Sequence, residues 1–185
     1  YNLVERIRSR HVARIFGHGV SESHAYLVME FFDGGDLNKR LGDKAMPPEE
    51  ALRIFRELML ALGDIHEQGI LHRDLKPQNL MFRADGSLAI VDFGIAKHVD
   101  SIDRTSQGEV LGTPRYMSPE QVQGRALDLR TDIYSAGVLL YQMVTGKHLF
   151  SGETAVEVAL HHLNTPPPAL PQDLERYQRL FDKLL

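Results

Sequence analysis

The most informative stretch of the chain reads HRDLKPQN from His72 to Asn79, and DFG follows at residues 92–94 after a short predicted hairpin. Phosphoryl transfer needs a carboxylate to accept a hydroxyl proton, a cation at the moving phosphoryl group and oxygen ligands for Mg²⁺. One Asp and one Asn amide oxygen, together with phosphates and water, suit the few hard oxygen ligands that magnesium prefers. The two motifs supply these groups as Asp74, Lys76, Asn79 and Asp92.

Periodicity and turn residues place these motifs among helices and short strands. A helix begins at residues 47–50, where prolines and acidic residues favour a first turn, and it ends at Gly69. Residues 133–144 are apolar nearly all round, which predicts a helix inside the core. The other expected elements are strands at 13–16 and 25–32 with a turn between them from Gly17 to Ser23, a short helix from Asp36 to Leu41, a hairpin of 80–83 with 88–91, a long loop at 95–117, and helices near 154–163 and 173–185.

Composition restricts the function classes. The 185 residues are 43% hydrophobic and 25% charged, which is ordinary for a globular domain and excludes disorder. A net charge of -4 gives no field for gripping nucleic acid or acidic membranes, and the absence of cysteine excludes disulfide scaffolds and thiol nucleophiles. The longest apolar run, 136–141, is far shorter than the roughly 20 residues that span a bilayer. We therefore expect a soluble, cytoplasmic chain with no nucleic-acid partner and no membrane segment, and leave open an anchor outside these residues.

The two motifs, in this order and with the intervening lysine, proline, asparagine and hairpin, resemble the eukaryotic-type (Hanks-type) serine/threonine protein kinases. The run from Met117 to Gln121 is similar in style to bacterial members. The resemblance implies an α+β, protein-kinase-like fold, mainly the helical C-terminal lobe with the hinge and remnant strands of the N-terminal lobe. Residues 1–32 would be the remnant of the N-terminal lobe and the start of the hinge, and residues 33–185 the C-terminal lobe.

The resemblance also implies an activity, namely transfer of the γ-phosphate of ATP to Ser or Thr hydroxyls of proteins, with Mg²⁺ or alternatively Mn²⁺. Asn79 and Asp92 would hold the metal. Asp74 would orient the substrate hydroxyl, and Lys76 would stabilise the transferred phosphoryl group. Thr113 matches a family threonine that bonds the catalytic aspartate and this lysine, which favours Ser/Thr over Tyr substrates.

The stretch from Met29 to Asp36 resembles the family's hinge. By position Met29 is the gatekeeper, and the backbone of Glu30 and Phe32 would meet the adenine edge. Asp36 would bond the ribose, and Met81 would form the floor under the adenine. Without the motifs, the same residues could simply be a buried strand followed by a helix cap.

Residues 112–120 resemble the family's substrate-facing segment, with Ser118 where Ala is usual and with Glu120 as a structural residue. The arginine that usually pairs with this glutamate would lie past Leu185. Asp132 resembles the aspartate that hydrogen-bonds the catalytic-loop backbone near His72 and Arg73. Asp132 could instead be a plain helix N-cap, or could serve both purposes.

Regulation is implied by Arg73, which matches the arginine that docks a phosphate of the activation loop. Thr105 is the phosphosite we expect first, and Glu109 is expected to substitute partly for a phosphate on Arg73. A polar, flexible loop without regulation is the alternative interpretation. The candidate phosphosites are Ser101, Thr105 and Ser106.

Two features of the family are missing. There is no glycine-rich G-x-G-x-x-G loop and no strand lysine before the first helix, and Glu5 is one turn too late for that lysine's partner. We therefore expect a kinase domain cropped at both ends and inactive by itself.

Two alternatives stay open. A pseudokinase-like binding or scaffold module would lack the N-terminal lobe, but Asp74, Asn79 and Asp92 are all intact. A small-molecule kinase of related fold would not need the segment at 112–120.

Overall fold

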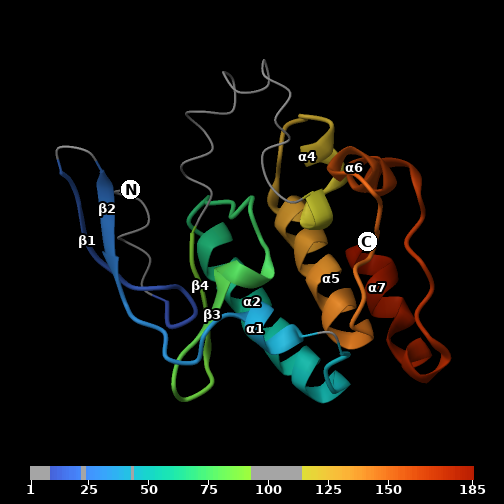
Figure 1. The fold of residues 1–185 in the computed structure, drawn as a ribbon, viewed down its shortest axis with the longest axis horizontal. Helices are drawn as coiled ribbons and strands as arrows, with labels where there is room; N and C mark the ends of the chain where they lie inside the picture. The colour runs from blue at the N-terminus through green and yellow to red at the C-terminus, as the bar shows by residue number, and fades with distance from the viewer. Residues whose placement is uncertain (1–8, 22–23, 43, 93–113) are drawn as a thin grey trace.

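The computed structural model describes residues 9–21, 24–42, 44–92 and 114–185. Figure 1 shows a helical body with one strand pair set apart from it. A second strand pair lies on the side of the body that faces the first pair. The elements in chain order are β1 (Ile15–Val20), β2 (Ala25–Met29), α1 (Leu37–Leu41), α2 (Pro48–His66), the 3-10 turn η2 (Pro77–Asn79), β3 (Leu80–Phe82), β4 (Leu88–Ile90), η5 (Pro114–Tyr116), α4 (Pro119–Val122), α5 (Leu129–Thr145), α6 (Ala155–Asn164), η6 (Gln172–Tyr177) and α7 (Gln178–Leu184).

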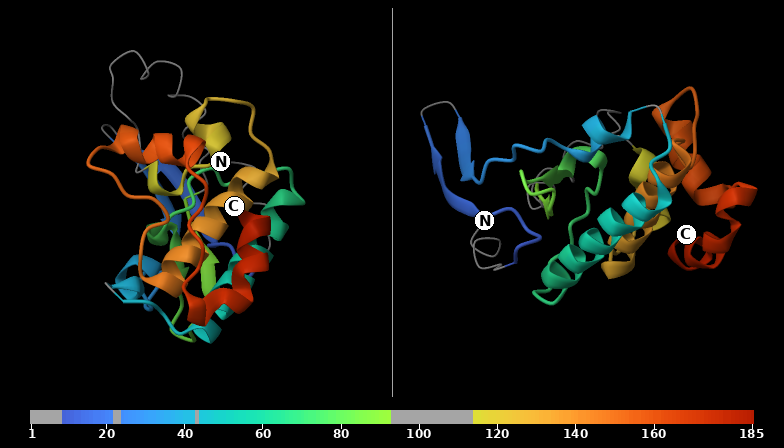
Figure 2. Two further views of the ribbon diagram at one scale, coloured as in Figure 1. Left: turned by 90° about the vertical axis from the view of Figure 1, so that its right-hand side faces the viewer. Right: turned by 90° about the horizontal axis from the view of Figure 1, so that it is seen from below.

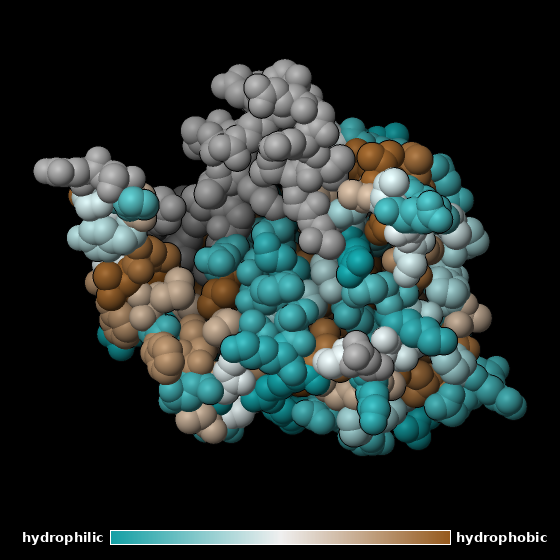
Figure 3. All heavy atoms as spheres, in the orientation of Figure 1, coloured by the Kyte–Doolittle hydropathy of each residue, from teal (hydrophilic) through white to brown (hydrophobic). Residues whose placement is uncertain are grey.

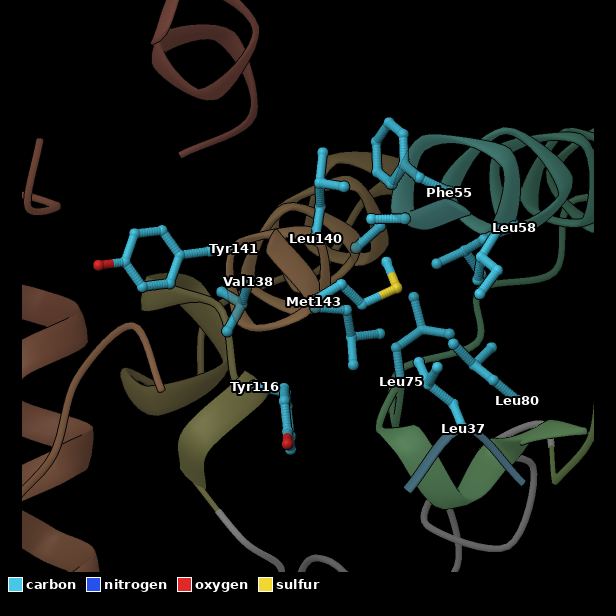
Figure 4. Packing of buried hydrophobic residues seen from close by; sticks show 14 of the residues in the cluster. Leu37, Phe55, Leu58, Leu75, Leu80, Tyr116, Val138, Leu140, Tyr141 and Met143 are labelled. Carbon is cyan, nitrogen blue, oxygen red and sulfur yellow. The ribbon is translucent and has the colours of Figure 1, made fainter. Parts of the chain in front are cut away.

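The core lies between α2 and α5, which run side by side through the body in Figures 1 and 2. α2 turns an apolar stripe toward the core, and Ile54, Leu58 and Leu62 are almost completely buried against the rest of the cluster. Figure 4 shows Leu58 and Phe55 of α2 facing Leu140 and Met143 of α5. Burial of these side chains supplies most of the driving force that holds the body together.

The central helix begins four residues before the expected start at 133. Asp128 is its N-cap, and the Asp128 carboxylate accepts a hydrogen bond of 2.9 Å from the backbone N–H of Arg130. Aspartate is favoured at helix N-cap positions, and this segment has two, Asp128 and Asp132. The apolar run begins at 133, directly after Asp132, so the sequence pattern favours a helix start there. The prediction that Asp132 is an N-cap is wrong, because Asp132 lies inside the first turn of α5.

The first hairpin differs from the expected strands. β1 does not turn at Gly17 but continues through Gly17 and Gly19 to Val20, paired antiparallel with β2. At Gly19 the exposed Tyr26 side chain lies over the backbone, since a Cβ atom there would lie 2.4 Å from the Tyr26 hydroxyl. The actual turn starts at Ser21, whose N–H donates to the carbonyl of His24. The hairpin exposes Phe16, Val20, Tyr26 and Val28, and brown atoms mark this apolar surface on the left of Figure 3.

Residues 11–13 connect this hairpin to the body by pairing with β4. The N–H of Ala13 donates to the Ile90 carbonyl over 3.0 Å, and the N–H of Ile90 donates to the His11 carbonyl over 2.9 Å. β3 and β4 pair antiparallel as expected. The Glu57 carboxylate of α2 accepts the N–H of Leu88, which fixes the β3–β4 hairpin to the body.

The last expected helix, 173–185, is divided into the 3-10 turn η6 and the helix α7. α7 packs closely on α5 at Gly137, where a Cβ atom would lie 2.8 Å from Leu184 Cβ. Among the described residues, no helix combines the length and the apolar character needed to cross a membrane.

Candidate active site

The loop between α2 and β3 carries the first motif, and its backbone is strained at a defined place. Arg73 has a φ of 66° and Asp92 a φ of 54°, and these are the two non-glycine residues with positive φ in the part of the chain that the structure describes. Such conformations cost about 1–3 kcal/mol each and persist only where the surroundings impose them. Both therefore need strong neighbouring contacts.

Asp132 supplies those contacts for the loop. One carboxylate oxygen accepts the N–H of Arg73 over 2.8 Å. The other accepts the N–H of His72 over 2.8 Å and the Nε2–H of His66 over 2.8 Å. Burial alone would raise the pKa of Asp132, but these hydrogen bonds outweigh it and keep the pKa below its usual value. The two backbone bonds are those that the resemblance implies for this residue.

His72 connects the loop to the second motif. Its ring is fully buried, and Nε2 donates to the Val91 carbonyl over 2.9 Å while Nδ1 accepts from the N–H of Asp74 over 3.3 Å. This pair of roles is that of a neutral imidazole, and burial lowers the pKa of His72 accordingly. The N–H of Val91 donates to the Asn79 carbonyl over 3.0 Å. With both backbone groups of Val91 held, Asp92 follows one residue after the backbone bond to Asn79.

The side chains of the first motif form a small polar cluster. Lys76 Nζ donates to Asp74 Oδ2 over 2.8 Å, and Asn79 Nδ2 donates to the Asp74 carbonyl over 2.8 Å. Asn79 is almost completely buried, and its committed amide nitrogen leaves the amide oxygen as the group for a cation. Asn79 and Asp92 therefore fit a magnesium ion that takes its remaining ligands from phosphates and water. Within the described ranges, no group of three or more His, Asp or Glu side chains could hold a metal.

Among the residues expected to form the hinge, Asp36 lies beside β3. Asp36 caps α1, since its carboxylate accepts the N–H of Lys39 over 2.8 Å, and it pairs with Met81 through an isolated bridge. Met81 packs on a second apolar cluster of Ala13, Phe32, Ala89 and Val91. Met29 ends β2. In the described part of the chain we find no hydrogen bond to the carbonyl of Glu30 or from the N–H of Phe32.

The segment at 114–122 is docked onto the same loop. Gln121 Nε2 donates to the Arg73 carbonyl over 2.7 Å, and Ser135 Oγ donates to the Tyr116 carbonyl over 2.6 Å. Glu120 accepts from the Thr131 hydroxyl. Ser118 caps α4 and forms a capping box with Gln121, a role that the usual Ala would lack.

Several expected residues cannot be placed. Thr113, Thr105, Ser106 and Glu109 lie outside the described residues, as does Ser101. Arg73, the expected docking residue, is described, and its buried Nε has no hydrogen-bond partner among the described residues.

Other residues that build the site were missed by the sequence reasoning. His66 lies at the end of α2, and Gln121 and Arg83 bond to residues about 50 positions away, so no local pattern marks them.

The strand pair set apart from the helical body, the strained loop and the buried aspartate beneath it define a class of protein. Residues 1–180 match the protein kinase domain, and the chain belongs to that family. Its α+β architecture agrees with the fold class expected from the motifs.

The comparison with curated proteins identifies bacterial relatives. The chain is 35% identical over 183 residues to the serine/threonine-protein kinase PknL of Mycobacterium tuberculosis, covering 98% of this chain and 46% of that protein. It is 39% identical over 162 residues to PknB of Mycobacterium leprae, covering 84% of this chain and 26% of that protein. It is 36% identical over 181 residues to PknA of Corynebacterium glutamicum, covering 95% and 39%. The chain thus spans less than half the length of these relatives.

Proposed function

We propose that the protein is a serine/threonine protein kinase that transfers the γ-phosphate of ATP to Ser or Thr hydroxyls of proteins. The observation that carries the proposal is the placement of Asp74, Lys76 and Asn79 on one loop, with Asp92 held beside Asn79 through the backbone of Val91. Within this proposal, residues 1–32 belong to the N-terminal lobe and the hinge, and residues 33–185 to the C-terminal lobe.

In the proposed mechanism, Asp74 orients the substrate hydroxyl and accepts its proton. Lys76 is ion-paired with Asp74 and reaches the phosphoryl group from there. The amide oxygen of Asn79 and the carboxylate of Asp92 would hold Mg²⁺, which when bound would neutralise charge on the phosphates. Thr113 lies outside the described residues; by the family resemblance it would bond Asp74 and Lys76 and so adapt the site to Ser and Thr.

The adenine is proposed to lie against the hinge. The carbonyl of Glu30 and the N–H of Phe32, which have no hydrogen-bond partner among the described residues, offer an acceptor and a donor for its edge. Met81 and the apolar cluster around it offer an apolar floor. Met29 would limit the depth of the pocket, and Asp36 would bond the ribose beside its cap hydrogen bond.

Phosphorylation is proposed to regulate the protein through Arg73. Its buried Nε, which has no partner in the part of the chain that the structure describes, supports this role, because a phosphate would supply an acceptor. Thr105 is the first candidate phosphosite and Ser106 the second. The carboxylate of Glu109 would bond part of the Arg73 guanidinium in place of a phosphate. Mapping of phosphates after incubation with ATP tests this, and finding none between 101 and 113 would contradict it.

The first prediction concerns the proposed chemistry. In the full-length protein, Asp74→Asn and Asp92→Asn are each expected to lower phosphate transfer to Ser/Thr peptides by about 10²-fold or more, because the base or the metal ligand is lost. Circular dichroism and thermal melting should stay close to wild type. Transfer is measured with radiolabelled ATP.

Asp173→Asn is the matched control, since Asp173 is exposed on η6, and it should keep full activity. Full activity in either active-site variant would contradict the proposal. A wild-type protein that binds ATP but never transfers phosphate would instead favour the scaffold alternative.

A further inference from the structure

Arg83, the first residue after β3, bonds to three separate parts of the chain. Its Nε donates to Glu30 Oε1 over 2.7 Å. Its Nη1 donates to the Arg10 carbonyl over 2.7 Å and approaches Ser87 Oγ at 3.4 Å. The guanidinium carbon lies 5.7 Å from the centre of the Phe32 ring. One planar cation thus joins the strand that carries Met81 to the residues on either side of Phe31.

Both carboxylate oxygens of Glu30 accept a hydrogen bond in this network. Its second carboxylate oxygen accepts the N–H of Arg14 over 2.9 Å, and its own N–H donates to the Arg14 carbonyl over 2.9 Å. The side chain of Glu30 is 19% exposed and that of Arg83 is 26% exposed, so water screens this pair less than a surface pair. Charge-assisted bonds in such a setting are directional and fix the backbone that carries them.

The backbone farther along the hinge is held in another way. The N–H of Gly34 donates to the Phe82 carbonyl over 2.9 Å, and the N–H of Phe82 donates to the Gly35 carbonyl over 2.8 Å. A Cβ atom at Gly34 would lie 2.8 Å from the Phe82 carbonyl oxygen, so glycine permits this close approach. Residues 34–36 are therefore fixed to β3 by main-chain pairing. At residues 30–32, Glu30 is bonded to Arg83, and Phe32 also packs with Ala89 and Val91 in the second apolar cluster.

The other end of the network is anchored in the body. The N–H of Arg83 donates to the Ser87 carbonyl over 3.0 Å, and the next residue, Leu88, donates its N–H to Glu57 of α2 over 2.7 Å. A continuous set of hydrogen bonds runs from α2 through the β3–β4 turn to Glu30.

We propose that Arg83 is a positioning residue for the nucleotide: by holding Glu30 and stacking near Phe32, it sets the distance between the Glu30 carbonyl and the Phe32 N–H to which adenine would bond. This inference rests on the proposed kinase function and assigns to Arg83 a role in nucleotide affinity. It assigns no role in the chemical step, because Asp74, Asn79 and Asp92 are held by Asp132 and His72 instead.

The test uses the full-length protein and two readouts, the Kd for Mg-ADP by calorimetry and the kcat and KM for ATP with a Ser/Thr peptide. Arg83→Met keeps the length of the side chain and removes its bonds, and we expect the Kd and KM to rise about tenfold with kcat within about twofold. Glu30→Gln should act in the same direction. The double variant should be no weaker than Arg83→Met alone, because both changes break one network. Arg83→Lys should restore part of the affinity.

Arg130→Met is the control, since it removes an exposed Arg–Asp pair with Asp128 on α5. It should leave both readouts unchanged. An unchanged Kd in folded Arg83→Met, or equal losses in kcat and in peptide affinity, would overturn the inference. If Arg83→Met fails to fold, Glu30→Gln with an unchanged Kd would do the same. A wild-type protein that binds Mg-ADP but transfers no phosphate would refute the kinase proposal alone, and the Kd comparison would still decide the role of Arg83.

Discussion

Asp132 is the residue on which the geometry of the candidate active loop depends. Its carboxylate is completely buried and accepts from His66 and from two consecutive backbone N–H groups of the loop. One of those N–H groups belongs to Arg73, whose φ of 66° would otherwise be costly. Part of the stabilisation from these hydrogen bonds therefore offsets the cost of the unfavourable backbone conformation at Arg73.

Asp132→Asn is therefore expected to reduce the free energy of unfolding by about 2–4 kcal/mol. An amide has one acceptor oxygen, and its NH₂ group would face a backbone N–H that also needs an acceptor. Urea unfolding followed by circular dichroism measures the loss. Asp128→Asn makes the same chemical change four residues earlier in α5, where the side chain is exposed and Asn caps as well as Asp, so it should cost under about 0.5 kcal/mol. Equal losses in the two variants would contradict this account.

At the scale of the elements, the sequence predicted the helices that short-range interactions along the chain determine. The helices at 48–66 and 155–164 were predicted within about three residues, because periodicity and capping residues mark them. The first hairpin was misjudged at Gly17, because glycine signals a turn locally while its pairing with β2 is set by residues ten positions away. The start of α5 was missed because Asp128 and Asp132 carry the same cap signal.

Only some residues of the candidate site could be predicted from the sequence. Asp74, Lys76, Asn79 and Asp92 were found because their spacing forms a dense motif. Arg83 and His66 were not found, because each acts through a partner more than 50 residues away that no local pattern reveals. Resemblance to a family extends to residues in motifs and does not reach those between them.

The packing of α6 predicts a pH dependence of stability. His162 is 4% exposed, its Nδ1 bonds the Tyr134 hydroxyl at 2.8 Å, and Phe150 packs edge-on against its ring. Burial lowers the pKa of His162 to about 4. The unfolded chain binds the proton more readily, so the stabilisation is present above pH 6.5 and is lost as pH falls toward 4.

Between pH 7.5 and 5.5, this histidine alone should reduce the free energy of unfolding by about 1 kcal/mol. Urea unfolding at a series of pH values measures the dependence. His162→Gln, which does not titrate, should show a flatter dependence than wild type by that amount. The difference isolates His162 from the buried His72, whose pKa is also lowered. Parallel curves for the two proteins would show that His162 is not the group responsible.

At the scale of the whole molecule, α5 is the element on which the other parts converge. It contacts α2, α7 and η5 and carries Asp132 toward the loop. Its own apolar character nearly all round follows from this position, since few of its faces meet solvent. The close approach at Gly137 is what brings α7 against it.

Gly137→Ala is expected to lower the free energy of unfolding by about 1 kcal/mol, as overpacking against Leu184 outweighs the better helix propensity of alanine. Gly63→Ala is the matched control in α2, where a Cβ atom meets nothing within 4 Å, and it should raise the free energy of unfolding by up to about 1 kcal/mol. Thermal unfolding of both variants gives the two signs. Stabilisation by both changes would show that α7 moves aside without cost.

The large sequence separation between Asp132 and the loop also determines when the loop can form during synthesis. The loop leaves the ribosome about 60 residues before the side chain that fixes its backbone at His72. At about 5–20 residues per second, translation leaves the loop without its anchor for about 3–12 s. Throughout that interval the strained peptide at Arg73 lacks the Asp132 carboxylate, so the nascent chain carries every residue of the candidate loop before that loop can take its final shape. The residues of the loop are synthesised early, but the loop reaches its final conformation late.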